Sequence, residues 1–305
     1  MDRLAAMAVF RRVVELGSFA GAARDLNLSN AATSKHVAAL EAHLGAQLLH
    51  RTTRRLSLTE TGQAVYERCV RVLDDVTDLE AAVGQMEAQP RGRLRINAPM
   101  SFGLSDLGPL LPRFLERYPD ITVDLVMNDR VVDLVEEGFD VGVRIRSELG
   151  DTSMIGRRIG GVLPVVCASP DYLARRGTPQ VPEDLMDHDC LQYSLSATGD
   201  EWIFRNEAGE ERRIRPKGRL TANNGDVLRA SAVGGLGIWR TPDFLAELDV
   251  AGGRLVPIDL GGFRLASHSI YVIYPPGRHL SPKVRAFVDF LVETVGARCR
   301  SRGAP

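Results

Sequence analysis

The strongest constraint on this 305-residue chain lies in its first 60 residues, whose apolar positions fit three short helices in succession. The first of these helices has an apolar stripe at Leu4, Met7, Phe10 and Val14. Gly17 and Ser18 are typical of a helix end followed by a helix start, so this helix is expected to end near Leu16. A second helix is predicted over 19–26, where small residues allow another helix to pack closely.

The third predicted helix has the features of a DNA-recognition helix. Ser29 is a good N-cap and Gly45 ends the helix. Its expected inward stripe is Thr33, Val37, Leu40 and Leu44. The opposite face is small and polar, with side chains at Asn30, Ala31, Ser34, Lys35, Ala38 and Ala42. Short side chains let a helix approach base edges in the major groove, and Asn, Ser and Lys supply hydrogen bonds. The alternative is the solvent face that any three-helix head has.

A basic turn follows directly. Residues 48–58 fit two short strands around a tip, which is the pattern of a wing, and Arg51, Arg54 and Arg55 suit contact with phosphates or the minor groove. A solvated hairpin is the alternative, but the position next to a helix-turn-helix favours the wing. The whole chain has a formal net charge of −1, so a basic character is confined to this head.

A heptad pattern begins after Thr59. Apolar side chains alternate spacings of four and three at Val65, Cys69, Val72, Val76, Leu79, Val83 and Met86. Three heptads with acidic flanks predict one long helix that pairs with a second copy of itself and ends before Pro90. The alternative is an amphipathic helix packed on its own domain.

The remainder of the chain alternates short strands with helices and predicts an α/β architecture. Strands are expected at 93–97, 122–127, 141–145, 163–168 and 270–274. Helices are expected at 102–118, 131–137, 226–233 and 282–298. The glycine-rich run 232–238 lacks the Lys and Ser/Thr of a phosphate-binding loop and fits a turn into a strand. Trp239, which follows it, either lines a cleft or fills the core.

Candidate ligand-binding residues lie where predicted strands lead into helices. Three loops qualify: Pro99-Met100-Ser101, Asn128-Asp129 and Asn223-Asn224-Gly225. Helix N-termini there offer free N–H groups and a positive dipole to an anion. Arg144 and Arg146 add cationic forks at the end of another strand, which suit a carboxylate. The alternatives are that Ser101 and Asn224 only cap helices and that Arg144 pairs with Asp140.

Other classes of protein find little support. The sequence has no HExxH, GxSxG or SxxK motif, and its six histidines do not have ligand or triad spacing. No CxxC pair occurs among Cys69, Cys167, Cys190 and Cys299, so neither a metal site nor a disulfide is predicted and reduced cytosolic thiols are expected. No signal peptide and no membrane-length apolar stretch is recognised.

The run LNLSNAATSKHVAALEAHLGAQLLHRTTRRLSLTETG (residues 26–62) resembles the LysR-type transcriptional regulators. The resemblance implies a winged helix-turn-helix, mainly α, at 1–59 and a linker or dimerisation helix at 60–89. It further implies an α/β effector-binding domain at 90–305, similar to periplasmic binding proteins, with a small effector between two lobes. We expect lobe I at 90–162 and 268–305 and lobe II at 163–267.

The resemblance also implies roles for individual residues. Asn30, Ala31, Ser34 and Lys35 would meet bases or phosphates, and Arg54 would reach the DNA backbone or minor groove. The family most often has Gln-Pro and Ser-Arg at the four helix positions, so its base preference is not transferable. Arg51 would either contact DNA or brace the wing on the third helix. The run from Trp239 to Pro242 departs from the small apolar residues and Leu-Pro step usual in the family.

The leading hypothesis is therefore a cytoplasmic, non-enzymatic transcription regulator that binds double-stranded DNA as a homodimer or homotetramer. No cofactor or metal is expected beyond a small-molecule effector, for which two arginines suggest an organic acid. Activation through RNA polymerase follows from the resemblance. The expected effector contacts are Met100, Ser101, Asn128, Arg144, Arg146 and Asn223. The alternatives are a two-lobed solute-binding protein or enzyme, and a regulator that senses oxidation at Cys167 or Cys190.

Overall fold

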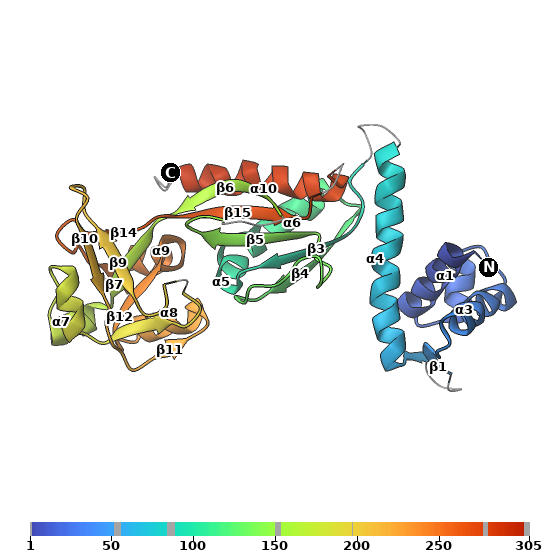
Figure 1. The fold of residues 1–305 in the computed structure, drawn as a ribbon, viewed down its shortest axis with the longest axis horizontal. Helices are drawn as coiled ribbons and strands as arrows, with labels where there is room; N and C mark the ends of the chain where they lie inside the picture. The colour runs from blue at the N-terminus through green and yellow to red at the C-terminus, as the bar shows by residue number, and fades with distance from the viewer. Residues whose placement is uncertain are drawn as a thin grey trace. The chain divides into compact units, whose positions relative to one another are not determined.

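A computed structural model describes residues 2–51, 56–83, 89–149, 154–196, 198–276 and 280–301 of the chain (Figure 1). It divides into two compact units, Met1–Gln89 and Pro90–Pro305. Each unit has its own buried apolar cluster, so each is described by itself.

The first unit contains the three predicted helices, α1 (Arg3–Leu16), α2 (Phe19–Asp25) and α3 (Asn30–Leu44). A side-chain oxygen accepts a backbone N–H at the start of each helix, from Asp2, Ser18 and Ser29. Thr33, Val37 and Leu40 are buried as predicted, but Leu44 is 44% exposed. The chain turns at Gly45 immediately after Leu44, and Leu48 and Leu49 enter the core instead.

The predicted wing strands are present as β1 (Leu49–Arg51) and β2 (Leu56–Leu58), which pair antiparallel. The tip, including Arg54 and Arg55, lies outside the described residues. Glu41 on α3 anchors the base of the wing, because one carboxylate oxygen accepts the N–H groups of Leu48 at 2.8 Å and Leu49 at 3.3 Å. The position of β1 relative to α3 is thus fixed by a charged acceptor.

Helix α4 (Glu60–Val83) begins after Thr59, whose hydroxyl accepts the N–H of Gly62 at 2.8 Å. The apolar positions of the predicted heptad pattern differ in their burial along this helix. Val65 and Cys69 belong to the apolar cluster of the first unit, and Tyr66 packs edge-on against Phe10 on α1. Val72 is 40% exposed, and the side chains of Leu79, Val83 and Met86 lie outside the described part of the chain. The alternative of packing on its own domain therefore holds for the first part of the seam.

The second unit begins with a five-stranded sheet. Its strands are β3 (Gly92–Ala98), β4 (Ile121–Met127), β5 (Val141–Arg146), β6 (Ile155–Val162) and β15 (His268–Tyr274), in the order β4-β3-β5-β15-β6. Strand β3 is parallel to β4 and β5, whereas β15 is antiparallel to both of its neighbours. Helices α6 (Gly108–Arg117) and α10 (Pro282–Ser301) contribute to its core, and Figure 1 shows α10 along β6 and β15. We call this assembly the first lobe.

Two predicted helices of the first lobe differ from the structure. The expected helix 102–118 is divided into α5 (Met100–Phe102), a π-helical turn η1 (Gly103–Leu107) and α6. The expected helix 131–137 is wrong, since this segment forms turns and Val131 is 73% exposed. The Asp133 carboxylate accepts the N–H groups of Val135 and Glu136, and such a local turn competes with a helix.

The second lobe is built on two further sheets. One contains β7 (Pro164–Ala168), β8 (Cys190–Tyr193), β11 (Thr221–Ala222), β12 (Ile238–Pro242) and β13 (Val256–Pro257), in the order β11-β8-β12-β7-β13. The other contains β9 (Trp202–Arg205), β10 (Glu211–Ile214) and β14 (Arg264–Leu265), in the order β10-β9-β14. The helices of this lobe are α7 (Pro170–Arg176), the 3₁₀ helix η2 (Pro182–Asp187), α8 (Gly225–Val233) and α9 (Asp243–Ala251).

Two interpretations of the glycine-rich run and its neighbour are resolved. The segment forms the turn from α8 into β12, and Gly235 has the left-handed φ of 75°. Trp239 is 1% exposed and belongs to the core of the second unit. None of the helices within the described ranges combines the length and the apolar composition that a membrane crossing requires.

Gly62 provides a test of how α4 meets the wing. A Cβ atom at this position would lie 1.9 Å from the carbonyl oxygen of Leu48, which is part of the backbone and has little room to move. We expect Gly62→Ala to lower the free energy of unfolding of the full chain by about 1–3 kcal/mol, measured by urea denaturation. Gln63→Ala, at an exposed position one residue later, is the control and should change it by less than about 0.5 kcal/mol. Equal effects of the two substitutions would contradict the close approach.

Candidate functional site

The outer face of α3 carries the residues predicted to contact DNA. Asn30, Ala31 and Lys35 are exposed, and Ser34 is partly buried at the edge of this face. All four lie in the first two turns of the helix, where Ser29 caps the N-terminus by accepting the N–H of Ala32 at 3.1 Å. The structure thus brings these four side chains together on one surface, whereas Arg54 lies outside the described residues.

Two arginines on α1 are paired with acidic neighbours. Arg12 on α1 contacts both carboxylate oxygens of Asp25 on α2, at 2.6 and 2.7 Å, and this contact holds the pKa of Asp25 below its ordinary value. Arg11 pairs with Glu15 at 2.8 Å. Lys35 makes no ion pair with any residue that the structure describes. Its ammonium group is therefore available to a phosphate.

In the second unit, two predicted loops meet at the junction of the lobes. The Ser101 hydroxyl donates to a carboxylate oxygen of Asp226, on the first turn of α8, at 2.8 Å. The Met100 N–H donates to Asp129 at 2.9 Å. Asn224 caps α8, as its alternative interpretation proposed, by accepting the N–H groups of Asp226 and Val227. Ser101 does not cap α5, because Pro99 occupies the N-cap position.

A second contact across the junction involves Tyr193, which the sequence did not single out. Its hydroxyl lies close enough to the carboxyl group of Asp129 for each group to shift the pKa of the other. Burial raises the pKa of the Asp129 carboxyl, and the Met100 N–H and the Tyr193 hydroxyl oppose that shift, while the charge of Asp226 adds to it. Asp129 and Ser101 belong to the first lobe, and Tyr193 and Asp226 to the second. The hydrogen bond from Ser101 to Asp226 and the contact between Tyr193 and Asp129 therefore both cross between the lobes.

Arg144 on β5 is buried, and none of the described residues provides it with a counterion. Its side chain is 9% exposed, and one terminal nitrogen donates to the Asn97 side-chain oxygen at 2.6 Å and to the Val143 carbonyl at 2.8 Å. The other terminal nitrogen has no hydrogen-bond partner among the described residues. Burial, followed by the charge of Arg146, lowers the pKa of Arg144 to about 10.

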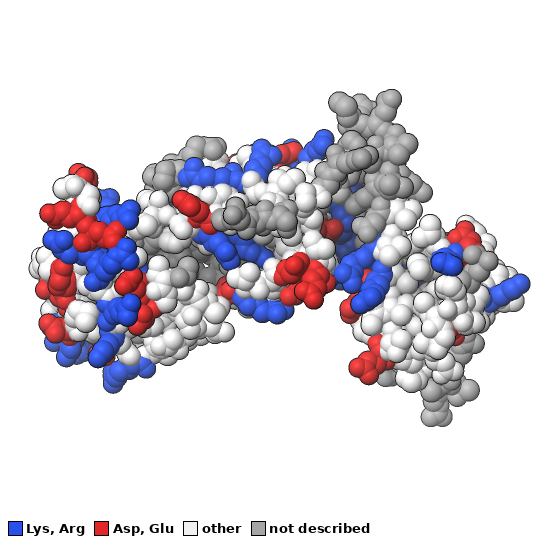
Figure 2. All heavy atoms as spheres, viewed as in Figure 1, with Lys and Arg blue, Asp and Glu red and all other residues white. Residues whose placement is uncertain are grey.

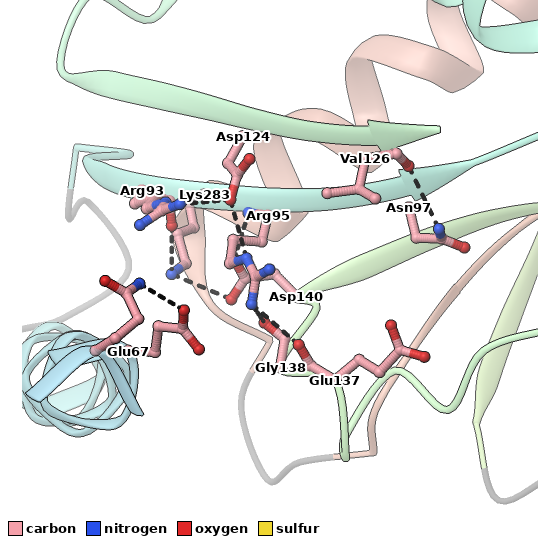
Figure 3. Close-up of polar contacts among 11 residues, drawn as sticks. Glu67, Arg93, Arg95, Asn97, Asp124, Val126, Glu137, Gly138, Asp140 and Lys283 are labelled. Carbon is pink, nitrogen blue, oxygen red and sulfur yellow. Dashed lines mark hydrogen bonds and ion pairs between the residues drawn. The ribbon is translucent and has the colours of Figure 1, made fainter. Parts of the chain in front are cut away.

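The alternative pairing of Arg144 with Asp140 is wrong. Asp140 accepts the backbone N–H of Arg95 at 2.7 Å, and one of its oxygens lies 3.2 Å from the Lys283 ammonium (Figure 3). Asn97, the actual partner of Arg144, donates its amide to the carbonyl of Val126 at 3.3 Å, as the same view shows.

Asn128 lies on the same side of the first sheet as Arg144. Asn97 pairs with Val126 and with Gly142, so side chains two residues further on, at Asn128 and Arg144, share its face. One strand separates them, which corresponds to a Cα distance of about 10 Å. The side-chain oxygen of Asn128 is buried and has no partner in the described structure. An unpaired donor and an unpaired acceptor thus lie at one edge of the sheet.

The remaining predicted ligand residues are less enclosed. Arg146 and Asn223 are both exposed. Met100 and Ser101 lie with Asp129 and Asp226 at the junction, whereas Arg144 lies on β5 and Asn128 directly follows β4 in the first sheet. The sequence-predicted residues therefore form two groups, and Asp226 and Tyr193 complete the first.

The cysteine alternative has unfavourable chemistry. Cys167 and Cys190 are fully buried, and burial raises the pKa of each thiol to about 12. Oxidation proceeds through the thiolate, which this environment suppresses. Groups of three or more His, Cys, Asp or Glu side chains that could hold a metal are absent from the described residues.

Comparison with known proteins agrees with this architecture. Residues 4–63 match the bacterial regulatory helix-turn-helix protein of the lysR family, and residues 87–296 match the LysR substrate binding domain. The chain belongs to the LysR family. It is a transcription regulator with a helix-turn-helix DNA-binding part and a two-lobed effector-binding part.

Several relatives cover almost the whole chain. The transcriptional regulator CrgA of Neisseria meningitidis is 37% identical over 290 residues, which are 95% of this chain and 96% of the relative. A transcriptional repressor of Pseudomonas aeruginosa is 37% identical over 294 residues, 96% and 92% of the two chains. The solved structure of CrgA has a TM-score of 0.62 at 35% identity and covers 96% of this chain and 98% of its own.

The shifted pKa of Asp129 predicts a pH-dependent effect of Asp129→Asn. A carboxyl group with a raised pKa in the folded chain favours the protonated form, so its ionisation destabilises the fold as the pH rises above about 4. Asn keeps an oxygen that can accept from Met100 and carries no charge. The variant should therefore exceed the wild type in free energy of unfolding at pH 7, and this gain should vanish below about pH 4.

Urea denaturation at a series of pH values measures this difference. Asp120→Asn, which removes an exposed carboxylate from the same lobe, serves as the control. If the difference in free energy of unfolding between Asp129→Asn and the wild type stays constant from pH 4 to pH 7, ionisation of Asp129 does not destabilise the fold.

Proposed function

We propose that α3 lies in the major groove with Asn30, Ala31, Ser34 and Lys35 facing the DNA. The observation that supports this most directly is the exposure of these small or polar side chains on one surface, with no acidic partner for Lys35 within the described residues. Arg54 at the wing tip would add a contact to the backbone or minor groove. Asn30 and Ser34 would read bases, and Lys35 would bind a phosphate.

Substituting Lys35 tests this assignment. We expect Lys35→Ala to weaken DNA binding and to lower the slope of log affinity against log salt by about 0.9 for each phosphate that Lys35 neutralises, measured by fluorescence anisotropy over a salt series. Arg11→Ala removes the same charge from a side chain that Glu15 already holds, and its slope should equal that of the wild type. An unchanged slope for Lys35→Ala would overturn the assignment.

The effector is proposed to be an organic acid bound by Ser101, Asn128 and Arg144, with Met100, Arg146 and Asn223 at the margins. Burying a guanidinium without a counterion is unfavourable, and a carboxylate would supply both the charge and an acceptor for the unpaired nitrogen of Arg144. Asn128 would accept a hydrogen bond from the same ligand. Arg144 carries the argument, because its guanidinium is buried and one of its nitrogens has no partner among the described residues.

Effector binding would act through the junction of the lobes. A ligand changes the conformation of a protein only when it binds two arrangements with different affinity. Ser101 would have to exchange its bond to Asp226 for one to the ligand, so occupancy of the site and the contact between the lobes are linked. DNA affinity would change with the arrangement of the lobes in the oligomer.

The remaining functional assignments rest on the family. We propose a DNA-binding domain at 1–59, a dimerisation helix at 60–89 and an effector domain at 90–305, with lobe I at 90–162 and 268–305 and lobe II at 163–267. The oligomer would be a homodimer or homotetramer that acts with RNA polymerase on DNA in the cytoplasm. A role other than catalysis is supported by relatives named as transcriptional regulators.

The effector site is tested by Arg144→Met, which keeps the length of the side chain and removes its charge. Thermal unfolding of the full chain is followed with benzoate, succinate, malate and pyruvate at equal ionic strength. An acid that stabilises the wild type should bind the variant at least about thirtyfold more weakly, because truncating a buried charged partner typically costs about 2 kcal/mol or more. Arg117→Met, which removes an exposed arginine paired with Glu293, should retain full binding. Retained binding by Arg144→Met would exclude this site.

A further inference from the structure

Arg240 is a second mostly buried arginine, and it lies in the segment that departs from the usual family sequence. It follows the core residue Trp239 on β12, and its side chain therefore points to the opposite face of the sheet. There its guanidinium lies over the ring of Trp202, 5.0 Å from the ring centre. Trp202 is itself fully buried in the cluster between the two sheets of the second lobe. Arg240 thus lies beneath the three-stranded sheet.

The hydrogen-bond partners of Arg240 are all uncharged. One terminal nitrogen donates to the carbonyl of Glu201 at 3.3 Å, and the other donates to the hydroxyl of Ser196 at 3.0 Å. The carboxylate of Glu201 is instead directed to Arg213 at 3.2 Å and Arg215 at 3.5 Å. Within the described residues no carboxylate forms an ion pair with Arg240.

Exposed arginines of the same region, in contrast to Arg240, form ion pairs with glutamates. Figure 2 shows acidic and basic side chains interleaved over the end of the molecule where β9 and β10 lie. Arg205 contacts Glu211 at 2.6 Å, and Arg212 contacts Glu183 at 3.2 Å. Exposed arginines gain little from such pairs, whereas a buried arginine needs one. Exposed arginines of this region therefore have carboxylate partners, whereas the more buried Arg240 has none among the described residues.

A second group that can carry positive charge interacts electrostatically with Arg240. His268, the first residue of β15, is mostly buried. Burial lowers the pKa of His268, and the charge of Arg240 lowers it further, while a hydrogen bond with the backbone of Ala266 opposes the shift. Two cation-forming side chains thus repel one another, and among the described residues no carboxylate forms an ion pair with Arg240. A bound anion would balance the positive charge of these two side chains.

We propose that Arg240, His268 and Ser196 form a second ligand site, which holds a small oxyanion such as a carboxylate or a phosphate. The planar guanidinium fork matches two oxygens of either group, the imidazole adds a donor, and the Ser196 hydroxyl can turn to donate a third hydrogen bond. Trp202 fixes the plane of the guanidinium. This site does not depend on the effector site at Arg144, which lies on the first sheet.

The location gives the anion a structural consequence. Ser196 follows β8 and Arg240 lies on β12, both in the second lobe, while His268 begins the strand that returns the chain to the first sheet. An anion bound to all three would fasten the second lobe to this crossing strand. It would therefore stabilise one arrangement of the lobes independently of the effector.

Thermal unfolding of the full chain tests the proposal with sodium phosphate, sodium acetate and sodium chloride at equal ionic strength and pH 7. Phosphate or acetate should raise the midpoint above the chloride value by about 3 °C at ten times the dissociation constant. The response to phosphate alone would identify a phosphoryl ligand, and a response to acetate a carboxylate. The increment should persist in Arg144→Met and disappear in Arg240→Met, which separates this site from the effector site.

Arg213→Met is the matched control, because it removes an exposed arginine from the same region and should leave the increment intact. Without added anion, Arg240→Met should unfold no earlier than the wild type, since it removes an uncompensated charge. If Arg240→Met does not fold, Trp202 fluorescence of the wild type provides the readout: phosphate or acetate, and not chloride, should change it, with Trp202→Phe as the blank. No increment over chloride in the wild type, or one that survives in Arg240→Met, would overturn the site.

Discussion

The hydrogen bond from Ser101 to Asp226 joins residues 125 positions apart in the chain, and the effector domain depends on it because it links two separately built sheets. The contact between the Tyr193 hydroxyl of the second lobe and the Asp129 carboxyl of the first lobe also crosses this junction. Both carboxyl groups are held by local backbone geometry: Asp129 by the Met100 N–H and Asp226 by the capped start of α8. A ligand that replaces these contacts would change the relation between the lobes if it binds the two arrangements with different affinity.

Buried positive charge is the second constraint on the effector domain. Arg144 and Arg240 donate to neutral groups, whereas Arg117 and Arg205 on the surface have acidic partners within 4 Å. A buried charge without a counterion lowers the stability of a folded chain. Charged groups in such surroundings are concentrated at functional sites. The two arginines lie in different lobes, which is why we assign them to separate ligands.

The sequence was sufficient wherever the determining contacts are local. The caps Ser18 and Ser29, the stop at Gly17 and the spacing of Thr33, Val37 and Leu40 act within one helix turn, and the corresponding elements are confirmed. The helix over 131–137 was wrong because the Asp133 carboxylate closes a turn that helical periodicity does not register. The partners of Ser101 and Arg144 could not be inferred, since Asp226 and Asn97 reach them through the tertiary fold. Arg240 was passed over for its neighbour Trp239, because only the sheet topology shows which face each side chain occupies.

The central claim is that a ligand at the lobe junction acts on the Ser101–Asp226 hydrogen bond and on the Asp129–Tyr193 contact, which cross between the lobes. Hydrogen exchange of the full chain, with and without a carboxylic acid that stabilises it, measures this directly through the amides of Met100, Asp226 and Val227, which Asp129 and Asn224 hold. The account predicts that the acid changes the protection of these amides and that Ser101→Ala removes the change. Exchange at all three amides that is unaffected by a bound acid would contradict it.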